Sequence, residues 1–243
     1  MYLSSKQPDS IPSGVYTTTE ELINLRQLGK ELNLSIKRPS QALMSGAVKT
    51  QYRGRGMEFA EVRPYQAGDD IRTIDWRVTA RTQTPYTKLF QEERERPVFV
   101  MIDQRSPMFF GSRSIFKSVY ATYIAAAIGW SAHNNNDRIG ALIFGDNEQG
   151  DIRAKRGKKA VLELLMQLTT FNQKLTSPIP ATRPIDLASM LKEVRRIAKP
   201  GSAVYILSDF HDYDWHCTDQ LSTISRHSEL TALHLSDLTL NTL

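Results

Sequence analysis

Residues 97–103 read Pro-Val-Phe-Val-Met-Ile-Asp, five consecutive apolar side chains that follow a proline and end in a carboxylate. An uninterrupted apolar run of this length is typical of a strand buried on both faces of a parallel sheet. The carboxylate of Asp103 is then expected at the sheet edge where ligands bind in such folds. This run therefore predicts an α/β fold.

Downstream of this run, apolar segments with strand and helix periodicity alternate. Helices are predicted over 115–133, 158–169, 185–198 and 215–227, and strands over 138–144, 151–155, 203–207 and 230–235. This order predicts a doubly wound, Rossmann-like, mostly parallel sheet with helices on both faces. Asp209 follows the strand over 203–207, so we expect it at the same edge as Asp103.

Upstream of the run, residues 53–97 are dense in charge, with nine Lys and Arg against eight Asp and Glu. Short alternating segments over 58–63 and 84–93, separated by a turn at Gly68-Asp69, predict ion-paired hairpins. Asp69, Asp70 and Asp75 lie near Arg72 and Arg77, which we expect to pair with them. A nucleic-acid groove needs a surplus of basic residues, so this balance argues against a nucleic-acid partner.

The N-terminal part begins with a polar arm, residues 1–16. Leu22, Leu25, Leu28 and Leu32 then recur at helical spacing, which predicts an amphipathic helix over 19–34. The expected organisation is therefore an N-terminal arm and helix (1–50), a β-rich insertion (51–96) and an α/β domain (97–243).

The composition indicates the cellular compartment in which the protein is expected. Its 243 residues carry a formal net charge of +5 and one cysteine, Cys217, which excludes an internal disulfide framework. No segment has the roughly 20 apolar residues of a membrane span or the apolar core of a signal peptide. We therefore expect a cytoplasmic protein without a membrane span.

Residues 54–82 read Gly-Arg-Gly-Met-Glu-Phe-Ala-Glu-Val-Arg-Pro-Tyr-Gln-Ala-Gly-Asp-Asp-Ile-Arg-Thr-Ile-Asp-Trp-Arg-Val-Thr-Ala-Arg-Thr. This run strongly resembles the signature of the bacterial DUF58 family. The likeness continues through residues 85–103, 110–117, 137–146, 207–210 and 226–237, and covers roughly residues 40–237. The signature residues are Arg63, Tyr65, Gly68, Asp69, Asp70, Arg72, Asp75, Trp76 and Arg81. This resemblance implies a von Willebrand factor A-like α/β domain behind a β-rich insertion, and a MoxR-type AAA+ ATPase as partner.

Von Willebrand A-like domains carry a metal-ion-dependent adhesion site, in which an Asp-x-Ser-x-Ser motif, a threonine and a late aspartate surround Mg²⁺. The resemblance places the first aspartate at Asp103, but Arg105 and Pro107 stand at the two serine positions. Asp209 matches the late aspartate and Thr182 the threonine. We expect a degenerate, metal-free site in which Arg105 replaces the metal's charge and pairs with Asp103 or Asp209. Mg²⁺ bound through Asp103 and Asp209, with Ser106 as a shifted ligand, is the alternative.

The function expected from these features is a non-enzymatic interaction module, an adaptor or co-chaperone that links the ATPase to an unknown client. Its binding edge would contain Asp103, Arg105, Ser106, Asp209 and the apolar loop at Met108-Phe109. Two alternatives stay open: a Mg²⁺-dependent ligand-binding domain, and a metal-dependent hydrolase or nuclease built on Asp69, Asp70 and Asp75.

Two further segments carry candidate groups. Residues 209–217 crowd Asp, His and Cys side chains, which we interpret as a polar loop with Asp214 capping the next helix. The basic run of Arg153, Lys155, Arg156, Lys158 and Lys159 predicts a solvated face or a contact for an acidic partner; it lacks the interleaved aromatic side chains of a single-strand binder.

Overall fold

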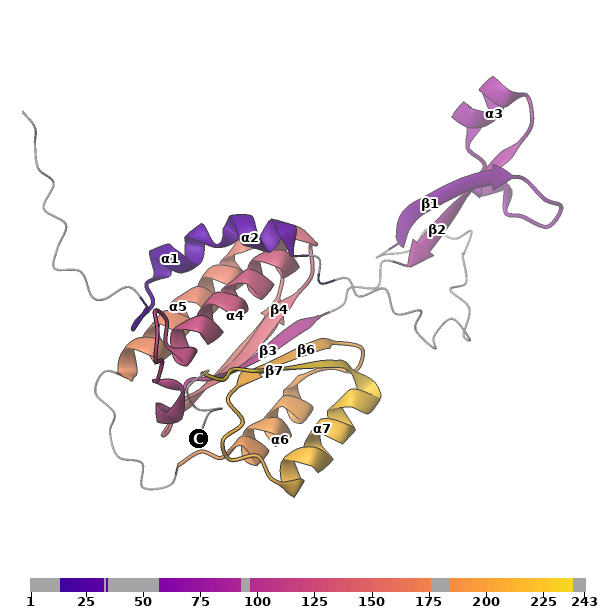
Figure 1. The fold of residues 1–243 in the computed structure, drawn as a ribbon. Coiled ribbons are helices and arrows are strands. Elements are labelled where there is room, and N and C mark those ends of the chain that lie inside the picture. Colours follow the sequence, from indigo (N-terminus) through magenta and orange to yellow (C-terminus); the bar gives the residue numbers. More distant parts are fainter. Residues whose placement is uncertain (1–13, 33, 35–56, 93–96, 176–183, 238–243) are drawn as a thin grey trace, which may run out of the picture. The chain divides into compact units, whose positions relative to one another are not determined.

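The computed structural model describes residues 14–32, 34, 57–92, 97–175 and 184–237 (Figure 1). Contacts within the chain divide it into two units. One combines residues 1–34 with 96–243 and is called the α/β unit below. The other, residues 35–95, is called the hairpin unit.

The α/β unit is built on a five-stranded sheet with the order β5-β4-β3-β6-β7. The strands are β3 (Val98–Asp103), β4 (Ile139–Phe144), β5 (Gln149–Lys155), β6 (Ala203–Ser208) and β7 (Glu229–His234). All neighbours pair in parallel except β5, which is antiparallel to β4. Every residue of β3, β4 and β6 is buried, as the apolar run predicts. The prediction of a mixed α/β fold with a mostly parallel sheet is confirmed.

Helices cover both faces of this sheet (Figure 1). On one face α4 (Lys117–Asn134) and α5 (Lys158–Lys174) pack around Trp130 and Ile102. On the other, α6 (Leu187–Ile197) and α7 (Trp215–His227) pack around Met101 and Ile206. The four helices predicted downstream of Asp103 are all present; α5 continues five residues beyond the predicted end at Thr169.

The predicted helix over 19–34 is wrong in its length and continuity. The structure has two short helices, α1 (Thr19–Asn24) and α2 (Arg26–Glu31), because Leu25 has ψ 0° and bonds its N–H to the carbonyl of Ile23. Leu22 is buried, but Leu28 is 47% exposed. The indole N–H of Trp130 donates to the carbonyl of Leu22 at 2.9 Å, which ties α1 to α4.

The hairpin unit pairs β1 (Met57–Pro64) with β2 (Tyr86–Glu92) in antiparallel fashion. The predicted pair of strands is present, but the segment between them is more than a turn. It contains a 3-10 helix, η2 (Ile71–Thr73), and an α-helix, α3 (Trp76–Thr82). The helix forms because the side chain of Asp75 accepts hydrogen bonds from the N–H groups of Arg77 and Val78, two donors of the first turn.

No helix in the described ranges is long and apolar enough to cross a membrane.

Candidate functional site

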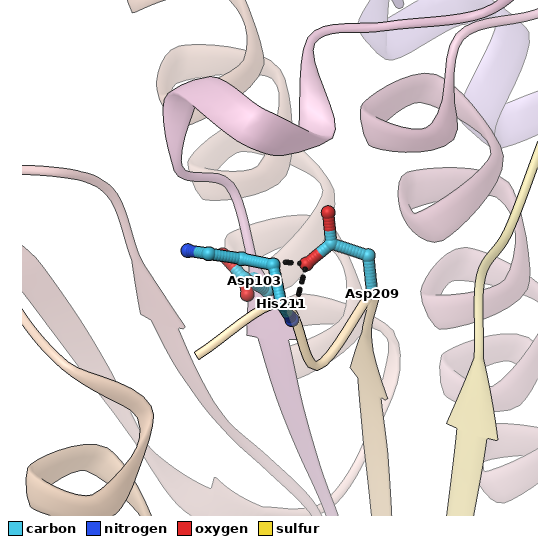
Figure 2. A group of neighbouring side chains, drawn as sticks. All are labelled: Asp103, Asp209 and His211. Carbon is cyan, nitrogen blue, oxygen red and sulfur yellow. Dashed lines mark hydrogen bonds and ion pairs between the residues drawn. The ribbon is translucent and has the colours of Figure 1, made fainter. Parts of the chain in front are cut away.

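The site lies at the carboxyl ends of β3 and β6. The chain leaves β3 towards β4 on one side and later returns to place β6 on the other side of β3. In open α/β sheets this reversal of strand order creates the crevice where ligands bind. Asp103 ends β3 and Asp209 follows β6, so the fold brings both predicted aspartates to this position (Figure 2).

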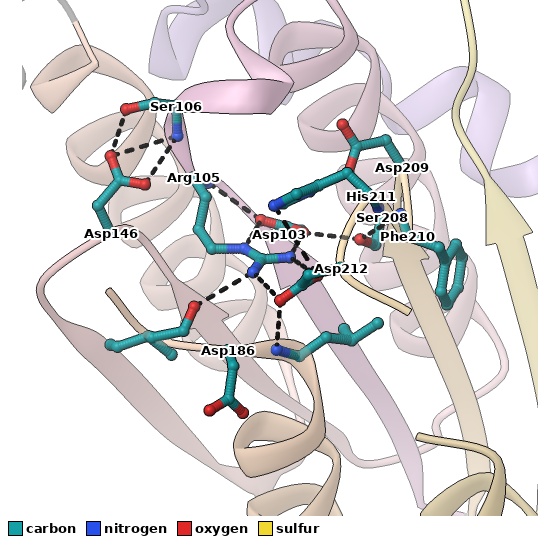
Figure 3. A network of polar contacts seen from close by, with 12 residues as sticks. Asp103, Arg105, Ser106, Asp146, Asp186, Ser208, Asp209, Phe210, His211 and Asp212 are labelled. Atoms are coloured by element: carbon teal, nitrogen blue, oxygen red, sulfur yellow. Dashed lines mark hydrogen bonds and ion pairs between the residues drawn. The ribbon is translucent and has the colours of Figure 1, made fainter. Parts of the chain in front are cut away.

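Asp103 is bound by the arginine two residues after it (Figure 3). Its carboxylate is 0% exposed and accepts three bonds from Arg105: the main-chain N–H at 3.0 Å, Nε at 3.0 Å and Nη2 at 2.7 Å. The hydroxyl of Ser208 on β6 donates a further bond at 2.7 Å. The buried carboxylate is therefore charge-compensated and hydrogen-bonded on both oxygens.

Arg105 reaches a second carboxylate through the same guanidinium. Nη1 and Nη2 donate to Asp212 at 2.6 and 2.9 Å, and Nη1 also donates to the carbonyl of Ile185 at 3.1 Å. With the two side-chain bonds to Asp103, all five guanidinium N–H groups have acceptors. Burial opposes the charge, but the bonds and charges of Asp103 and Asp212 outweigh it and raise the pKa of Arg105.

The carboxylate of Asp212 has a second hydrogen-bond donor besides Arg105. It also accepts the main-chain N–H of Leu187, the first residue of α6, at 2.9 Å. Partial burial raises the pKa of Asp212, yet the bonds from Arg105 and Leu187 outweigh that effect and lower it. The carboxylate therefore ties the loop after β6 directly to the start of α6, and through Arg105 to the end of β3.

Asp209 has a different cation as partner. Lys117, at the start of α4, donates from Nζ at 2.7 Å. Nδ1 of His211 lies 2.8 Å from the other carboxylate oxygen (Figure 2). Burial raises the pKa of Asp209, but Lys117 and His211 together lower it. Nε2 of His211 lies 3.8 Å from Asp212, so the histidine lies between two carboxylates.

The rim of the site is formed by the segment after β3. The main-chain N–H of Ser106 donates to Asp146 at 3.0 Å, and the two side chains are also hydrogen-bonded. Met108 is fully buried, while Phe109 stacks against Tyr16 with ring centroids 5.6 Å apart. Phe110 is 41% exposed and is the apolar side chain that this loop presents to solvent.

Asp103, Asp209 and His211 offer ligand atoms within 4.8 Å of one another, which is the spacing of a metal site. Mg²⁺ requires near-octahedral oxygen ligands and gives up its waters reluctantly. Here the carboxylate oxygens of Asp103 are engaged by Arg105 and Ser208, and Asp209 is engaged by Lys117. An added cation would meet a guanidinium and an ammonium at the same carboxylates, so these residues do not fit Mg²⁺ without rearrangement.

Of the residues predicted for this edge, the structure brings Asp103, Arg105, Ser106 and Asp209 to one end of the sheet. Asp209 is paired with Lys117 and not with Arg105. Thr182 lies outside the described residues. Sequence reasoning missed Lys117 and Asp212 as partners, because Lys117 lies 92 residues from Asp209 and Asp212 lies 107 from Arg105.

Several signature residues of the hairpin unit stabilise its turns through hydrogen bonds and ion pairs. Arg63 forms a two-bond ion pair with Asp69 through contacts of 2.9 and 2.8 Å, and the phenol of Tyr65 donates to the carbonyl of Asp69. Asp75 pairs with Lys88 at 3.4 Å. The pKa of Asp75 is lowered by the N–H of Val78, with a further contribution from Lys88.

The partners expected for these aspartates were Arg72 and Arg77, and that prediction is wrong for their side chains. Arg72 and Arg77 donate main-chain N–H groups to Asp70 and Asp75 at 2.9 and 3.1 Å. The pattern is a local turn, because an aspartate readily accepts the N–H two residues ahead.

The loop after β6 behaves as predicted where the helix begins. Asp214 caps α7 by accepting the N–H of Cys217 at 3.0 Å, and this bond lowers its pKa. Cys217 is buried in the apolar cluster under α7, and burial raises the pKa of its thiol. A thiol in that state is a poor nucleophile.

The basic run lies on β5 and the start of α5, where its five side chains are exposed. Lys155 contacts Glu163 at 3.3 Å. Because exposed ion pairs contribute little, this contact is compatible with a solvated face.

Comparison with known proteins gives relatives at moderate identity. Uncharacterized proteins of Mycobacterium bovis and of two strains of Mycobacterium tuberculosis are each 29% identical to the chain over 209 residues. The match covers 86% of this chain and 64% of each relative, so the chain spans less than two thirds of their length. The model of the family DUF58, described as a protein of unknown function, matches residues 61–243. With three quarters of its residues in that match, this chain belongs to the DUF58 family.

Proposed function

We propose that this protein is a non-enzymatic interaction module of von Willebrand A-like architecture. In this proposal it serves as an adaptor or co-chaperone of a MoxR-type AAA+ ATPase and binds through the carboxyl edge of its sheet. The observation that carries the proposal is the position of Arg105. Its guanidinium lies between Asp103 and Asp212, with every N–H bonded.

The charge balance of the edge supports a metal-free surface. Arg105 and Lys117 give each of Asp103, Asp209 and Asp212 a cationic partner, two positive charges against three negative ones, with side-chain contacts of 2.6–3.0 Å. In an adhesion site of the usual kind a divalent cation would supply this compensation. Two fixed cations from the chain itself would leave the edge ordered without metal.

The exposed groups at the rim suit a protein partner. Ser106 and Phe110 are exposed on either side of buried Met108, on a segment fixed by the Ser106–Asp146 bonds. An exposed aromatic side chain on an ordered loop is a common anchor in protein interfaces.

The test is capture of the MoxR-type ATPase of the same organism by the full chain, with and without ATP. We expect Phe110→Ala and Ser106→Arg to reduce capture about tenfold. Arg226→Glu is the matched control, because Arg226 is exposed near the end of α7, away from the carboxyl edge. Equal capture by all four proteins, or capture by none, would refute the proposed edge.

A Mg²⁺-dependent ligand-binding domain is the second candidate, favoured by the grouping of Asp103, Asp209 and His211. It requires that millimolar Mg²⁺ raise the melting temperature, since a ligand bound only to the native state stabilises it. Our proposal expects no such rise. A rise that disappears in His211→Ala would replace the metal-free interpretation.

A hydrolase or nuclease built on Asp69, Asp70 and Asp75 draws less support. Each carboxylate has a structural role, since Asp69 binds Arg63, Asp70 caps η2 and Asp75 caps α3. These bonds leave the three side chains directed at different partners.

A further inference from the structure

The hairpin unit presents an apolar and basic surface that the proposed function does not use. It consists of Ile71, Arg72, Trp76, Arg77 and Arg81, and is called the η2–α3 face below. All five side chains are exposed, with Ile71 at 65% and Trp76 at 66%. Arg77 and Arg81 are one helical turn apart on α3 and therefore share a side of the helix.

Between Val62 and Lys88 the chain is basic, with five Lys and Arg residues against three carboxylates. Between Val62 and Lys88 the carboxylates are Asp69, Asp70 and Asp75, and each bonds within the unit: to Arg63, to the N–H of Arg72, and to the N–H of Arg77 with Lys88. Within the described residues, the guanidinium groups of Arg72, Arg77 and Arg81 form no ion pair. The outward side of η2 and α3 is therefore positively charged.

The backbone beneath these side chains is fixed by partly buried polar contacts. The hydroxyl of Thr87, which is fully buried, lies 2.7 Å from that of Thr73. The N–H of Asp75 donates to the carbonyl of Tyr86 at 2.8 Å, and the N–H of Tyr86 donates to the hydroxyl of Thr79 at 3.0 Å. Trp76 is thus displayed on an anchored helix, and a preorganised anchor loses less entropy on binding.

We propose that the η2–α3 face binds an acidic segment of another protein that carries an apolar anchor residue. Its three guanidinium groups, which have no ion-pair partner among the described residues, complement carboxylates, and arginine binds these in two-bond geometry. Ile71 and Trp76 complement an apolar side chain, and Trp and Arg dominate the energetics of protein interfaces. Ile71 is aliphatic, which favours a protein anchor over a stacked nucleobase. This site lies on the hairpin unit and is independent of the carboxyl edge proposed above.

The test uses the full chain and three fluorescent probes: a peptide of alternating Glu and Leu, its Lys and Leu counterpart, and a short oligothymidylate. We expect the acidic peptide to bind, with affinity falling as salt is raised. Trp76→Ala, and Arg77→Glu combined with Arg81→Glu, should each weaken binding about tenfold or more. Trp215→Ala is the matched control, because Trp215 is 72% exposed on the α/β unit.

Three outcomes would overturn the proposal. If the acidic peptide does not bind, or if it binds equally well to the Trp76 and arginine variants, the η2–α3 face is not its binding site. Tighter binding of oligothymidylate through the same residues would make the face a nucleic-acid surface. Finally, acrylamide quenching of Trp215→Phe reports on Trp76, since Trp130 is fully buried. Absence of an accessible tryptophan would show that the face is covered by the same chain or by a second copy.

Discussion

The carboxyl edge of the α/β unit and the η2–α3 segment of the hairpin unit contain the same short pattern, an aspartate followed two residues later by an arginine. At Asp103, Asp70 and Asp75 the local turn is the same, with the arginine N–H donating to the carboxylate at 2.9–3.1 Å. The guanidinium groups then diverge. Arg105 turns inward and is 3% exposed, whereas Arg72 and Arg77 remain in solvent.

This contrast shows that the Asp-x-Arg pattern determines the local turn, whereas the surrounding residues determine whether the guanidinium group is buried in an ion pair or exposed to solvent. Arg105 has a buried carboxylate beside it and a second one, Asp212, brought by the loop after β6. Arg72 and Arg77 have aspartates whose oxygens are already engaged by main-chain N–H groups and by Lys88. The same local pattern can therefore give a buried ion-pair network in one unit and solvent-exposed arginines in the other.

The largest effect that tests this comparison is the loss of the buried cation. Arg105→Met leaves Asp103, which is 0% exposed, without its partner, and should lower the free energy of unfolding by about 3–5 kcal/mol. Urea denaturation in a Trp76→Phe and Trp215→Phe background, which leaves buried Trp130 as the fluorophore, reports on this unit. The double variant Asp103→Asn with Arg105→Met should recover part of the loss, because the unpaired charge is removed. A loss below about 1 kcal/mol would show that the guanidinium is not the compensating charge.

A smaller loss is expected at the second cation of the edge. Lys117→Met keeps an aliphatic stem but removes the ammonium group from Asp209, and should destabilise the protein by about 1–3 kcal/mol. The effect is smaller than at Arg105 because Asp209 keeps His211 as a hydrogen-bond partner. Asp209→Asn in the Lys117→Met background should restore stability, measured by the same denaturation. No recovery would mean that Lys117 acts through packing alone.

Lowering the pH should reduce the stability that the ion pairs of Asp209 and Asp212 contribute to the folded protein. The pKa values of Asp209 and Asp212 are lowered in the folded protein. The unfolded chain therefore binds more protons as pH falls through the unfolded carboxylate pKa of about 4, and stability decreases with falling pH. This contribution is present above that pH and is lost as pH falls through the folded pKa values. In Asp212→Asn the urea midpoint should fall less steeply over this range; an unchanged slope would contradict the assignment.

The smallest effect is expected on the outward side of the hairpin unit. Arg77→Met removes a guanidinium without an ion-pair partner in the described ranges, and should change stability by no more than about 0.5 kcal/mol. Thermal unfolding followed by circular dichroism measures this change. A loss similar to that of Arg105→Met would show that the two regions do not differ in the way proposed here.

Much of the α/β unit could be predicted from sequence because its elements have strong local signals. The run before Asp103 is apolar without interruption, and helix α7 begins and ends where Trp215 and His227 were expected. The break at Leu25 and helix α3 could not be predicted as readily. The first depends on a single backbone angle, and α3 is a two-turn helix, too short for periodicity to distinguish.

The amino-acid order was enough to establish the alternation of strands and helices, the placement of Asp103 and Asp209 at strand ends, and the DUF58 signature. The folded structure was needed to establish that Lys117 forms an ion pair with Asp209 and that Asp212 is the second carboxylate bound by Arg105. It also showed that three arginines of the hairpin unit are exposed to solvent. The physical reason is that hydrophobic periodicity and turn preferences act between near neighbours in the chain. The partner of a charge is set by which distant segments the packed sheet brings together, and by how much water remains there.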